Sequence, residues 1–452
     1  MDNKIKKNIP VVVRFFDYPV CVIVIIICGL GLPFALPWMF KQRRAWQNSV
    51  KGSPKALILR GFTLEKVNKR GYGHFMPFQN HSLKWVAIMD PVNNLETKIK
   101  IKDNLYLIAL KSPKIVGFIE QSGLVATSII LRELIGSIKV ANFCVRDQIG
   151  VLRVYGHNYQ ALQAFLVSIF IKIPFILDIV GNYELIHRLT GKAFYFRTLN
   201  KIPVIRNFAH RASNWLLGWP MRSAFRVLGR NKNNYEHAFA LGAPVDRLSL
   251  LRISNFNAAF NEFNPEQPPA RPADYPYILF VGRLAKINFP LDVIEAFNIA
   301  APQLPDHRLV IIGDGALKPV VVNKIEQSVY KDRIVFLGSC PSDTVLEWTA
   351  HAGIAICPYS GSTLVEAMLC SIPVIAYDVE WHAEIVIDDY TGFLVPFGDI
   401  EALAAKMVHV IGDQEAAEKV GRSGRDLARV VFDKEKIYAK ETNIYSQALS
   451  AN

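Results

Sequence analysis

The chain has 452 residues, of which 51% are hydrophobic and 20% charged, and a formal net charge of +13. This length exceeds one ordinary core, so two domains are expected, and the apolar fraction suits a globular protein with a membrane-associated part. The six cysteines stand singly, with no CxxC pair and no Cys/His cluster. This pattern argues against a disulfide framework and a metal site, and it indicates reduced cysteines in a cytosolic compartment.

The charge is unevenly distributed along the chain. Residues 271–452 carry 16 Lys and Arg against 24 Asp and Glu, a net of −8, which leaves 36 basic against 15 acidic residues and a net of +21 in residues 1–270. A basic half of this kind indicates an anionic partner, namely a membrane surface, a phospholipid-like substrate or nucleic acid. Solubility alone is the simpler alternative.

An uncharged stretch of 23 residues, YPVCVIVIIICGLGLPFALPWMF, covers positions 18–40. It is long enough to cross a bilayer, which takes ~20 residues. Basic residues on both sides leave its orientation ambiguous, and Pro33 and Pro37 would allow a broken, re-entrant helix instead. A cleaved signal peptide fits poorly, because no small-x-small site follows. We therefore expect residues 1–50 to anchor the chain to the cytoplasmic face of the cell membrane, by a spanning or a re-entrant helix.

Residues 51–260 show the rhythm of a first α/β domain. Continuous apolar runs predict buried strands, and the pattern of residues 158–172 predicts a helix between two of them. The expected strands are 55–60, 84–89, 105–110, 150–156 and 173–181.

A proline-rich segment, residues 261–276, predicts a linker, because it holds five prolines in sixteen residues. Beyond it, residues 277–452 repeat the α/β rhythm and end in a helical tail from about Asp399. Two doubly wound domains facing a cleft are expected, with ligands outside the carboxyl ends of the strands. The expected strands of the second domain are 277–282, 308–313, 333–338, 353–358 and 373–377.

Two short motifs follow strands of this second domain. In VGRL a strand ends at Gly282 and Arg283 follows, with Lys286 three residues on. That place suits an anion, although two solvated surface cations would give the same pattern. The sequence IIGDGALK, residues 311–318, is half of a dinucleotide fingerprint and is explained more simply by a tight strand-to-helix turn.

The segment CPYSGSTLVEAM places a small hydroxylated loop between a buried strand and a helix. Free N–H groups at such a helix start can bind a phosphate. Glu366 lies one turn into the helix, where a carboxylate could accept hydrogen bonds from the hydroxyls of a ribose. Thr363 and Glu366 also have the spacing of a capping box, so the local pattern leaves both interpretations open.

These motifs, with CSIPVIAYDVEWHAEIVIDDYTGFLVPFGDIEALA after them, resemble the C-terminal domain of glycosyltransferase family 4 over residues 277–410. The family comprises retaining enzymes of the GT-B fold, two Rossmann-like domains around a cleft. The resemblance implies that Arg283 contacts the diphosphate of a nucleotide-sugar donor and that Glu366 binds its ribose. It also implies that backbone groups of the loop before Glu366 cradle the diphosphate or the sugar: Gly361, Ser362, Thr363 and Leu364. Gly282, next to Arg283, is a further donor-binding candidate.

The sequence departs from the family pattern at three positions. Pro358 stands where the family has a glutamate that contacts the transferred sugar, and Asn288 stands where it has a lysine. Lys286 is near enough to supply that charge. In the first domain Val180 occupies the place of a family histidine, so the nearby polar residues Asp178 and Asn182 are candidates for the acceptor side, with Asp178 as a catalytic candidate.

The resulting prediction is a membrane-associated retaining glycosyltransferase that moves a sugar from a nucleotide-diphosphate sugar to an anionic lipid-linked or polysaccharide acceptor. Arg283 and Lys286 would stabilise charge on the departing diphosphate, without a metal or another cofactor. The departures motivate an alternative, a non-catalytic membrane protein of the same fold that binds a nucleotide sugar or a partner transferase. An epimerase of similar architecture is a weaker alternative. Nucleic-acid binding is not expected, because no recognisable module interleaves basic and aromatic residues.

Overall fold

The computed structural model describes residues 36–50, 55–62, 84–89, 97–102, 105–109, 125–156, 159–181, 203–252 and 258–451. The chain divides into two compact units. The first comprises residues 1–251 and 438–452, and the second comprises residues 252–437.

The first unit contains an eight-stranded sheet in the order β3-β4-β2-β1-β5-β6-β7-β8. All five strands expected from the sequence are present. This agrees with the rule that continuous apolar runs form the strands of parallel sheets. The strands are β1 Lys55–Phe62, β2 Lys84–Met89, β3 Thr97–Lys102, β4 Leu105–Ala109, β5 Val151–Tyr155, β6 Phe175–Ile179, β7 Arg226–Gly229 and β8 Leu248–Leu250.

Strands β3, β7 and β8 were not predicted from the sequence, and β3 is the antiparallel edge of an otherwise parallel sheet. Its sequence, TKIKIK, alternates lysine with isoleucine, so it lacks the continuous apolar run of a buried parallel strand. Charged residues at an edge strand discourage pairing with other chains.

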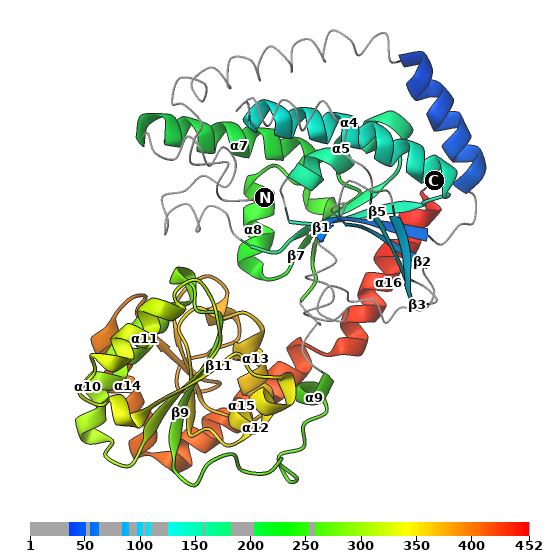
Figure 1. The fold of residues 1–452 in the computed structure, drawn as a ribbon. Helices are drawn as coiled ribbons and strands as arrows, with labels where there is room; N and C mark the ends of the chain where they lie inside the picture. The colour runs from blue at the N-terminus through cyan, green and yellow to red at the C-terminus, as the bar shows by residue number, and fades with distance from the viewer. Residues whose placement is uncertain are drawn as a thin grey trace. The chain divides into compact units, whose positions relative to one another are not determined.

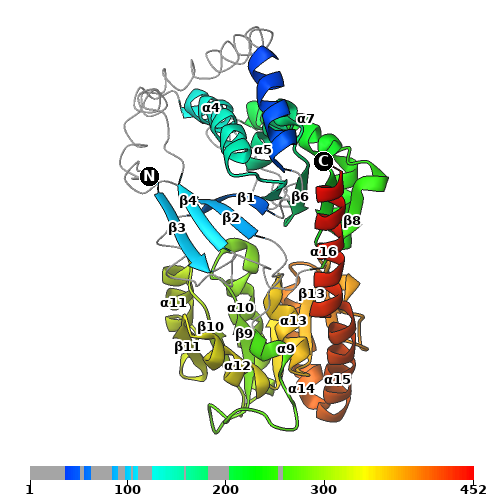
Figure 2. The same cartoon turned by 90° about the vertical axis from the view of Figure 1, so that its right-hand side faces the viewer.

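One face of this sheet is covered by a layer of helices, which Figures 1 and 2 show on the same side. Helix α5 packs against both α4 and α7. Residues 36–50 form a further helix beside them, since the Trp38 ring meets Phe170 of α5 and the Trp46 indole N–H donates to the Ile149 carbonyl at 2.7 Å. The labelled helices of the unit are α4 Val125–Arg146, α5 Tyr159–Ile171, α7 Pro203–Ser223 and α8 Lys232–Ala240.

The second unit contains a six-stranded parallel sheet in the order β11-β10-β9-β12-β13-β14. Its five predicted strands are confirmed; the short β14 was not predicted. The strands are β9 Tyr277–Val281, β10 Arg308–Ile312, β11 Ile334–Gly338, β12 Ile354–Cys357, β13 Val374–Tyr377 and β14 Phe393–Val395.

Helices cover both faces of the second sheet, with α10, α11 and α14 on one side and α9, α12, α13 and α15 on the other (Figure 1). The arrangement is doubly wound, as predicted. The helices are α9 Ala258–Asn261, α10 Pro290–Ala300, α11 Lys318–Glu326, α12 Ser342–Ala350, α13 Ser362–Leu369, α14 Ile400–Gly412, α15 Gln414–Val431 and α16 Lys434–Ser450.

The proline-rich segment 261–276, predicted to be a linker, instead packs on the second unit. Phe263 is part of its core, and the Arg425 guanidinium donates to the Phe263 carbonyl at 2.7 Å. Further along, a His351 ring nitrogen lies 2.7 Å from the Pro269 carbonyl oxygen. The boundary between the units precedes this segment, between Leu251 and Arg252.

The helical tail is present as predicted, but it does not belong wholly to the second unit, as the predicted domain 277–452 implied. Helix α16 begins in the second unit and ends in the first. Its residue Glu441 is buried and forms an ion pair with Arg153 of β5 at 2.8 Å. Tyr445 is also buried there, and its hydroxyl contacts Arg153. This buried polar contact, with the apolar packing around it, fixes the end of the chain to the first unit.

The predicted membrane segment, residues 18–40, lies outside the described residues up to position 35. Residues 36–40 open the helix that continues to residue 50. Among the residues that the structure describes, no helix combines the length and the apolar character needed to cross a membrane.

Two glycines with different surroundings allow a matched test of the packing of α15. A Cβ on Gly421 would lie 2.2 Å from the Ser371 carbonyl oxygen, whereas a Cβ on Gly412, at the end of α14, would meet nothing within 4 Å. We expect Gly421→Ala to lower the free energy of unfolding by about 1–3 kcal/mol through overpacking. Gly412→Ala should leave it unchanged or raise it by up to about 1 kcal/mol. Urea unfolding measures both, and equal effects would contradict the close contact.

Candidate functional site

The candidate site lies at the carboxyl edge of the second sheet, where the strand order reverses. From β9 the chain proceeds outward to β10 and β11, and then returns to β12, which pairs with β9 on its other side. Ligands of doubly wound sheets bind at such switch points, because the loops diverge there and leave a crevice.

Arg283 is positioned by a close approach of two backbone segments. The Gly282 N–H donates to the Ile312 carbonyl at 3.0 Å, and the Leu284 N–H donates to the Asp314 carbonyl at 3.0 Å. A Cβ on Gly313 would lie 1.8 Å from the Gly282 carbonyl oxygen, and its φ of 152° also favours glycine. The glycines of IIGDGALK therefore serve packing, as the simpler interpretation of that motif predicted.

The side chains of Arg283 and Lys286 are both exposed at this edge. Within the described part of the chain neither has an ion pair or a side-chain hydrogen bond. Two cations without carboxylate partners beside a strand end can bind an anion, and a guanidinium offers two parallel donors to a phosphate.

Helix α13 begins at Ser362, with Gly361 as its N-cap residue and without a side-chain cap. The capping box of Thr363 and Glu366 is therefore not formed, because Thr363 is already the second residue of the helix. The N–H groups of the first turn have no side-chain acceptor at the cap, so they are available to an anion.

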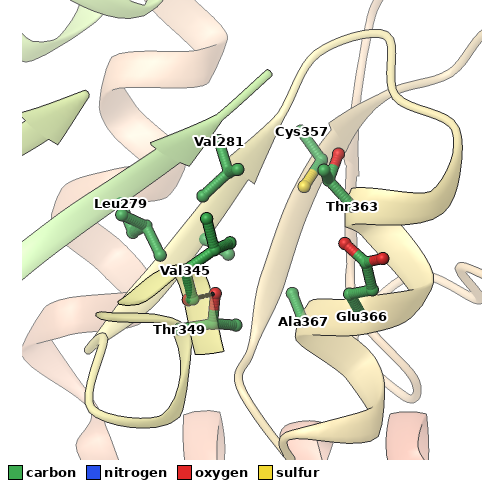
Figure 3. Close-up of a pocket in the computed structure, with 9 residues that line it drawn as sticks. Leu279, Val281, Val345, Thr349, Cys357, Thr363, Glu366 and Ala367 are labelled. Atoms are coloured by element: carbon green, nitrogen blue, oxygen red, sulfur yellow. Dashed lines mark hydrogen bonds between the residues drawn. The ribbon is translucent and has the colours of Figure 1, made fainter. Parts of the chain in front are cut away.

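Glu366 and Thr363 lie on the face of α13 that is turned toward β12, as Figure 3 shows. They line a small cavity of about 10 Å³ between β9, β12 and the helices α12 and α13. This space suits at most a single water molecule. Glu366 is half-buried. A ligand such as a ribose would therefore approach the carboxylate from the edge of the sheet instead of entering the cavity.

The loop after β12 is tied to the loops on either side of it. The Asn288 side-chain amide donates to the Tyr359 carbonyl at 3.0 Å, and the Tyr359 hydroxyl donates to the Glu380 carboxylate at 2.6 Å. Burial raises the pKa of Glu380, and burial together with that carboxylate raises the pKa of Tyr359, so the hydroxyl stays a donor. Asn288, where the family has lysine, thus has a structural contact.

His382 supplies a further tie in the same place. One ring nitrogen, Nδ1, lies 2.9 Å from the Tyr377 carbonyl oxygen, and Nε2 lies 3.3 Å from the backbone nitrogen of Ser360. With Nδ1 protonated, His382 donates to Tyr377 and accepts from Ser360. The ring is fully buried, and burial lowers its pKa, which favours the neutral form. The imidazole therefore fixes the loop just before α13.

Sequence analysis did not single out Tyr359, Glu380 or His382. The available signal was their position, since all three follow the carboxyl end of a predicted strand. Such a place collects functional loops in doubly wound sheets. Glu380 carries a second signal that only the structure reveals, a left-handed φ of 49°.

Thiol and metal chemistry gain no support from the described residues. Burial raises the pKa of Cys357 to about 12, so this thiol beside the site stays protonated and is a poor nucleophile. No cluster of three or more His, Cys, Asp or Glu residues in the described ranges has the arrangement of a metal site. The predicted independence from metal ions remains a prediction.

The acceptor-side candidates belong to the first unit. Asp178, on β6, is fully buried and its carboxylate pairs with Arg153 and with Arg230, the latter at 2.9 Å. A carboxylate without exposed surface cannot touch an acceptor while these pairs persist, so its evident role is to hold two arginines. Asn182 lies outside the described residues, and Val180 is exposed.

Comparison with known proteins finds a family model that matches most of the second unit. Residues 262–427 match the family model described as Glycosyl transferases group 1. N-acetyl-alpha-D-glucosaminyl L-malate synthase of Bacillus anthracis is 26% identical over 38% of this chain and 45% of its own length. The putative glycosyltransferase EpsD of Bacillus subtilis (strain 168) is 27% identical over 52% and 65%, respectively. CapM, a capsular polysaccharide biosynthesis glycosyltransferase of Staphylococcus aureus, is 25% identical over 38% and 46%. The matches thus span about half to two thirds of these relatives.

Solved structures share the fold over most of the chain. Sucrose-phosphate synthase of Thermosynechococcus elongatus superposes with a TM-score of 0.67 at 16% identity, covering 88% of this chain and 100% of that one. Anabaena HepE, in complex with UDP-glucose, gives a TM-score of 0.60 at 15% identity, with coverage of 88% and 100%. This likeness confirms the predicted GT-B fold.

The burial of His382 predicts a pH dependence of stability. Since burial holds the pKa of His382 in the folded protein below its ordinary value of 6.5, the unfolded chain binds the proton more readily. The contribution of the neutral His382 to the free energy of unfolding is then fully present above that value. It falls as the pH decreases below it, by up to about 1.4 kcal/mol per pH unit. We expect His382→Gln to flatten this decline in urea unfolding between pH 7 and 5. The control His409→Gln, at an exposed position of α14, should keep the wild-type slope; a wild-type slope in His382→Gln would contradict the buried neutral imidazole.

Proposed function

Because residues 262–427 belong to the group 1 glycosyltransferases, we propose that the chain is a membrane-associated retaining glycosyltransferase. It transfers a sugar from a nucleotide-diphosphate sugar to an anionic lipid-linked or polysaccharide acceptor, in the synthesis of a cell-surface glycan, at the cytoplasmic face of the membrane. One observation carries the proposal. Two exposed cations, an uncapped helix start and a half-buried glutamate meet at the switch point of the second sheet.

Each part of a nucleotide-diphosphate sugar finds a complementary group at this edge. Arg283 and Lys286 bind the diphosphate and stabilise the charge that develops on it as the sugar departs. The backbone N–H groups at residues 361–364 bind the same phosphates or the sugar. Glu366 accepts hydrogen bonds from the ribose hydroxyls, and no metal ion or other cofactor is required. The UDP-glucose bound by HepE, a protein of the same fold, supports this class of donor.

Charge and similarity to known proteins support an anionic acceptor and a membrane in this proposal. The first 270 residues carry a net charge of +21, which suits an anionic acceptor or membrane. The name of CapM, with its capsular polysaccharide, supports a glycan product. Asn182 is proposed for the acceptor side. Asp178 acts there by positioning arginines of the sheet.

A non-catalytic nucleotide-sugar-binding protein is the second candidate, and two observations favour it. Pro358 is buried where the family has a glutamate, and the Asn288 amide is engaged by the Tyr359 carbonyl where the family has a lysine. Turnover separates the candidates. Transfer of label from a radiolabelled nucleotide sugar to membrane lipid or glycan by the wild type, lost in Glu366→Ala, supports the enzyme, and donor binding without transfer supports the second candidate.

The predicted role of Glu366 is tested by separating donor binding from stability. Charge-assisted hydrogen bonds contribute about 1.5–3 kcal/mol, so Glu366→Gln should weaken donor binding roughly tenfold or more in calorimetry. Because no capping box depends on Glu366, the melting temperature should change little. Glu415→Gln, at an exposed carboxylate in the first turn of α15, is the matched control and should retain wild-type affinity. Equal losses of affinity and thermal stability in Glu366→Gln would assign this residue a structural role instead.

A further inference from the structure

Helix α7 of the first unit exposes a stripe of aromatic and cationic side chains. Arg211, Trp215, Trp219 and Arg222 are all exposed and follow one another at intervals of four, four and three residues. This spacing places them on one face of the helix. The exposed fractions of the two tryptophans are 64% and 44%, and their rings lie 5.9 Å apart, edge to face. Two tryptophans exposed side by side form an apolar patch, and contiguous exposed apolar patches mark interaction sites.

The stripe continues across the neighbouring helices of the same layer. The Phe165 ring of α5 lies 6.1 Å from Trp219, which joins α7 to α5. The helix of residues 36–50 exposes Leu36 and Phe40, the latter by 61%, at a spacing of four residues. Helix α5 packs on strands β1, β5 and β6, and buried residues of the other three helices belong to the same hydrophobic core. Their exposed side chains therefore lie on the side turned away from that core. We call this surface the outer face; its large exposed hydrophobic residues are Leu36, Phe40, Ile138, Ile169, Trp215 and Trp219.

The four helices of this layer are strongly cationic. Within their bounds the sequence contains nine lysines and arginines and a single acidic residue, Glu133. Asp147 follows α4 directly and pairs with Arg146. The other basic residues have few acidic neighbours along these helices, so this part of the sequence carries a strong excess of positive charge. The basic residues are Lys41, Arg43, Arg44, Arg132, Lys139, Arg146, Arg206, Arg211 and Arg222.

Arg222 sits at a groove between α7 and α8 that could receive an anionic head group. Asn214, Trp215 and His237 line this groove, whose volume is about 420 Å³. A Cβ on Gly218 or on Gly242 would lie 3.0 Å from Arg222 Nη1, so both glycines leave the space that the guanidinium occupies. The guanidinium also lies over the Trp219 ring, 5.8 Å from its centroid. A cation held beside two tryptophans is the combination found where proteins meet the head groups of a bilayer.

We propose that the outer face docks on the surface of a bilayer that contains anionic lipids, with Trp215 and Trp219 in the interface and the arginines among the phosphates. The length of the face favours a bilayer over a soluble glycan, because α7 alone extends for ~30 Å at 1.5 Å per residue. The sequence favours it as well, since Leu36 and Phe40 belong to the uncharged stretch 18–40. The inference rests on the membrane association proposed above and assigns a surface to it. It requires no contribution from the donor site.

Quenching of tryptophan fluorescence by brominated lipids tests the insertion of the two tryptophans. The full chain is mixed with vesicles of phosphatidylcholine and phosphatidylglycerol, with and without brominated acyl chains. We expect Trp215→Phe/Trp219→Phe to lose most of the quenching seen in the wild type, since the reporting rings are gone. The control Trp348→Phe/Trp381→Phe removes two buried tryptophans of the second unit and should keep the quenching seen in the wild type. Wild-type quenching in the Trp215→Phe/Trp219→Phe variant would overturn the proposal.

Charge reversal tests the electrostatic part and is independent of the fluorescence. Each basic residue near an anionic surface contributes about fivefold to partitioning, so Arg211→Glu/Arg222→Glu should lower vesicle binding in sedimentation by roughly tenfold or more. Lys331→Glu/Lys419→Glu, at exposed positions of the second unit, changes the net charge equally and should lower binding far less. Equal losses in both variants would mean that net charge alone drives binding, which overturns the assigned face.

The outcomes separate this inference from the proposed function. Sugar transfer that persists while both variants of the outer face behave like the wild type would overturn the docking surface alone. A chain that docks as predicted but transfers no sugar would overturn the enzyme alone. Acrylamide quenching of Trp215 and Trp219 can also be measured with a hyaluronan oligosaccharide and without any vesicle. If the oligosaccharide protects the two tryptophans, the ligand of the outer face is a glycan and not a bilayer, which overturns the proposal.

Discussion

The close backbone approach of residues 282–284 to residues 312–315 is the constraint on which the candidate site depends. Two hydrogen bonds join these segments, and Gly313 leaves no room for a side chain between them. The chain after β9 must therefore leave the sheet along a fixed path, which holds the backbone of Arg283 at the edge while its side chain stays free to meet an anion. The glycine pattern of IIGDGALK, which suggests nucleotide contact, therefore acts indirectly, by positioning the backbone of Arg283.

The loop after β12 is fixed in a different way, by side chains instead of by backbone contact. Asn288, Glu380 and His382 reach Tyr359 and Ser360 from two neighbouring loops. Because α13 begins two residues later, these contacts determine where its free N–H groups point. The candidate site therefore combines a cation on a fixed backbone with a fixed helix start, and groups positioned in this way need little reorganisation when charge develops on a leaving group.

The predictable parts of the structure are those in which local pattern and burial agree. Continuous apolar runs predicted ten strands, and the edge strand β3 was missed because its lysines give an alternating pattern. The proline-rich segment looked like a linker because prolines and polar residues mark loops, but local sequence does not reveal that Phe263 packs in a core. The capping box failed for a related reason. Its spacing is present, but the helix starts two residues too early for it to form, and a shift of one or two residues is below what sequence patterns resolve.

The same limit of local sequence patterns applies to Asp178, the candidate whose predicted role the structure changed most. A carboxylate at the carboxyl end of a strand in an α/β domain has the position of a functional residue, and β6 does place it there. Sequence cannot show that Arg153 and Arg230 pair with it, or that the distant Glu441 and Tyr445 contact Arg153 in turn. Removing one member of a buried ionic cluster leaves an uncompensated charge, which makes such clusters strongly selective for the arrangement they stabilise. The basic charge of the first unit is thus divided in two: an internal part that joins the end of the chain to the sheet, and an external part, on the helices, that remains available to an anionic partner.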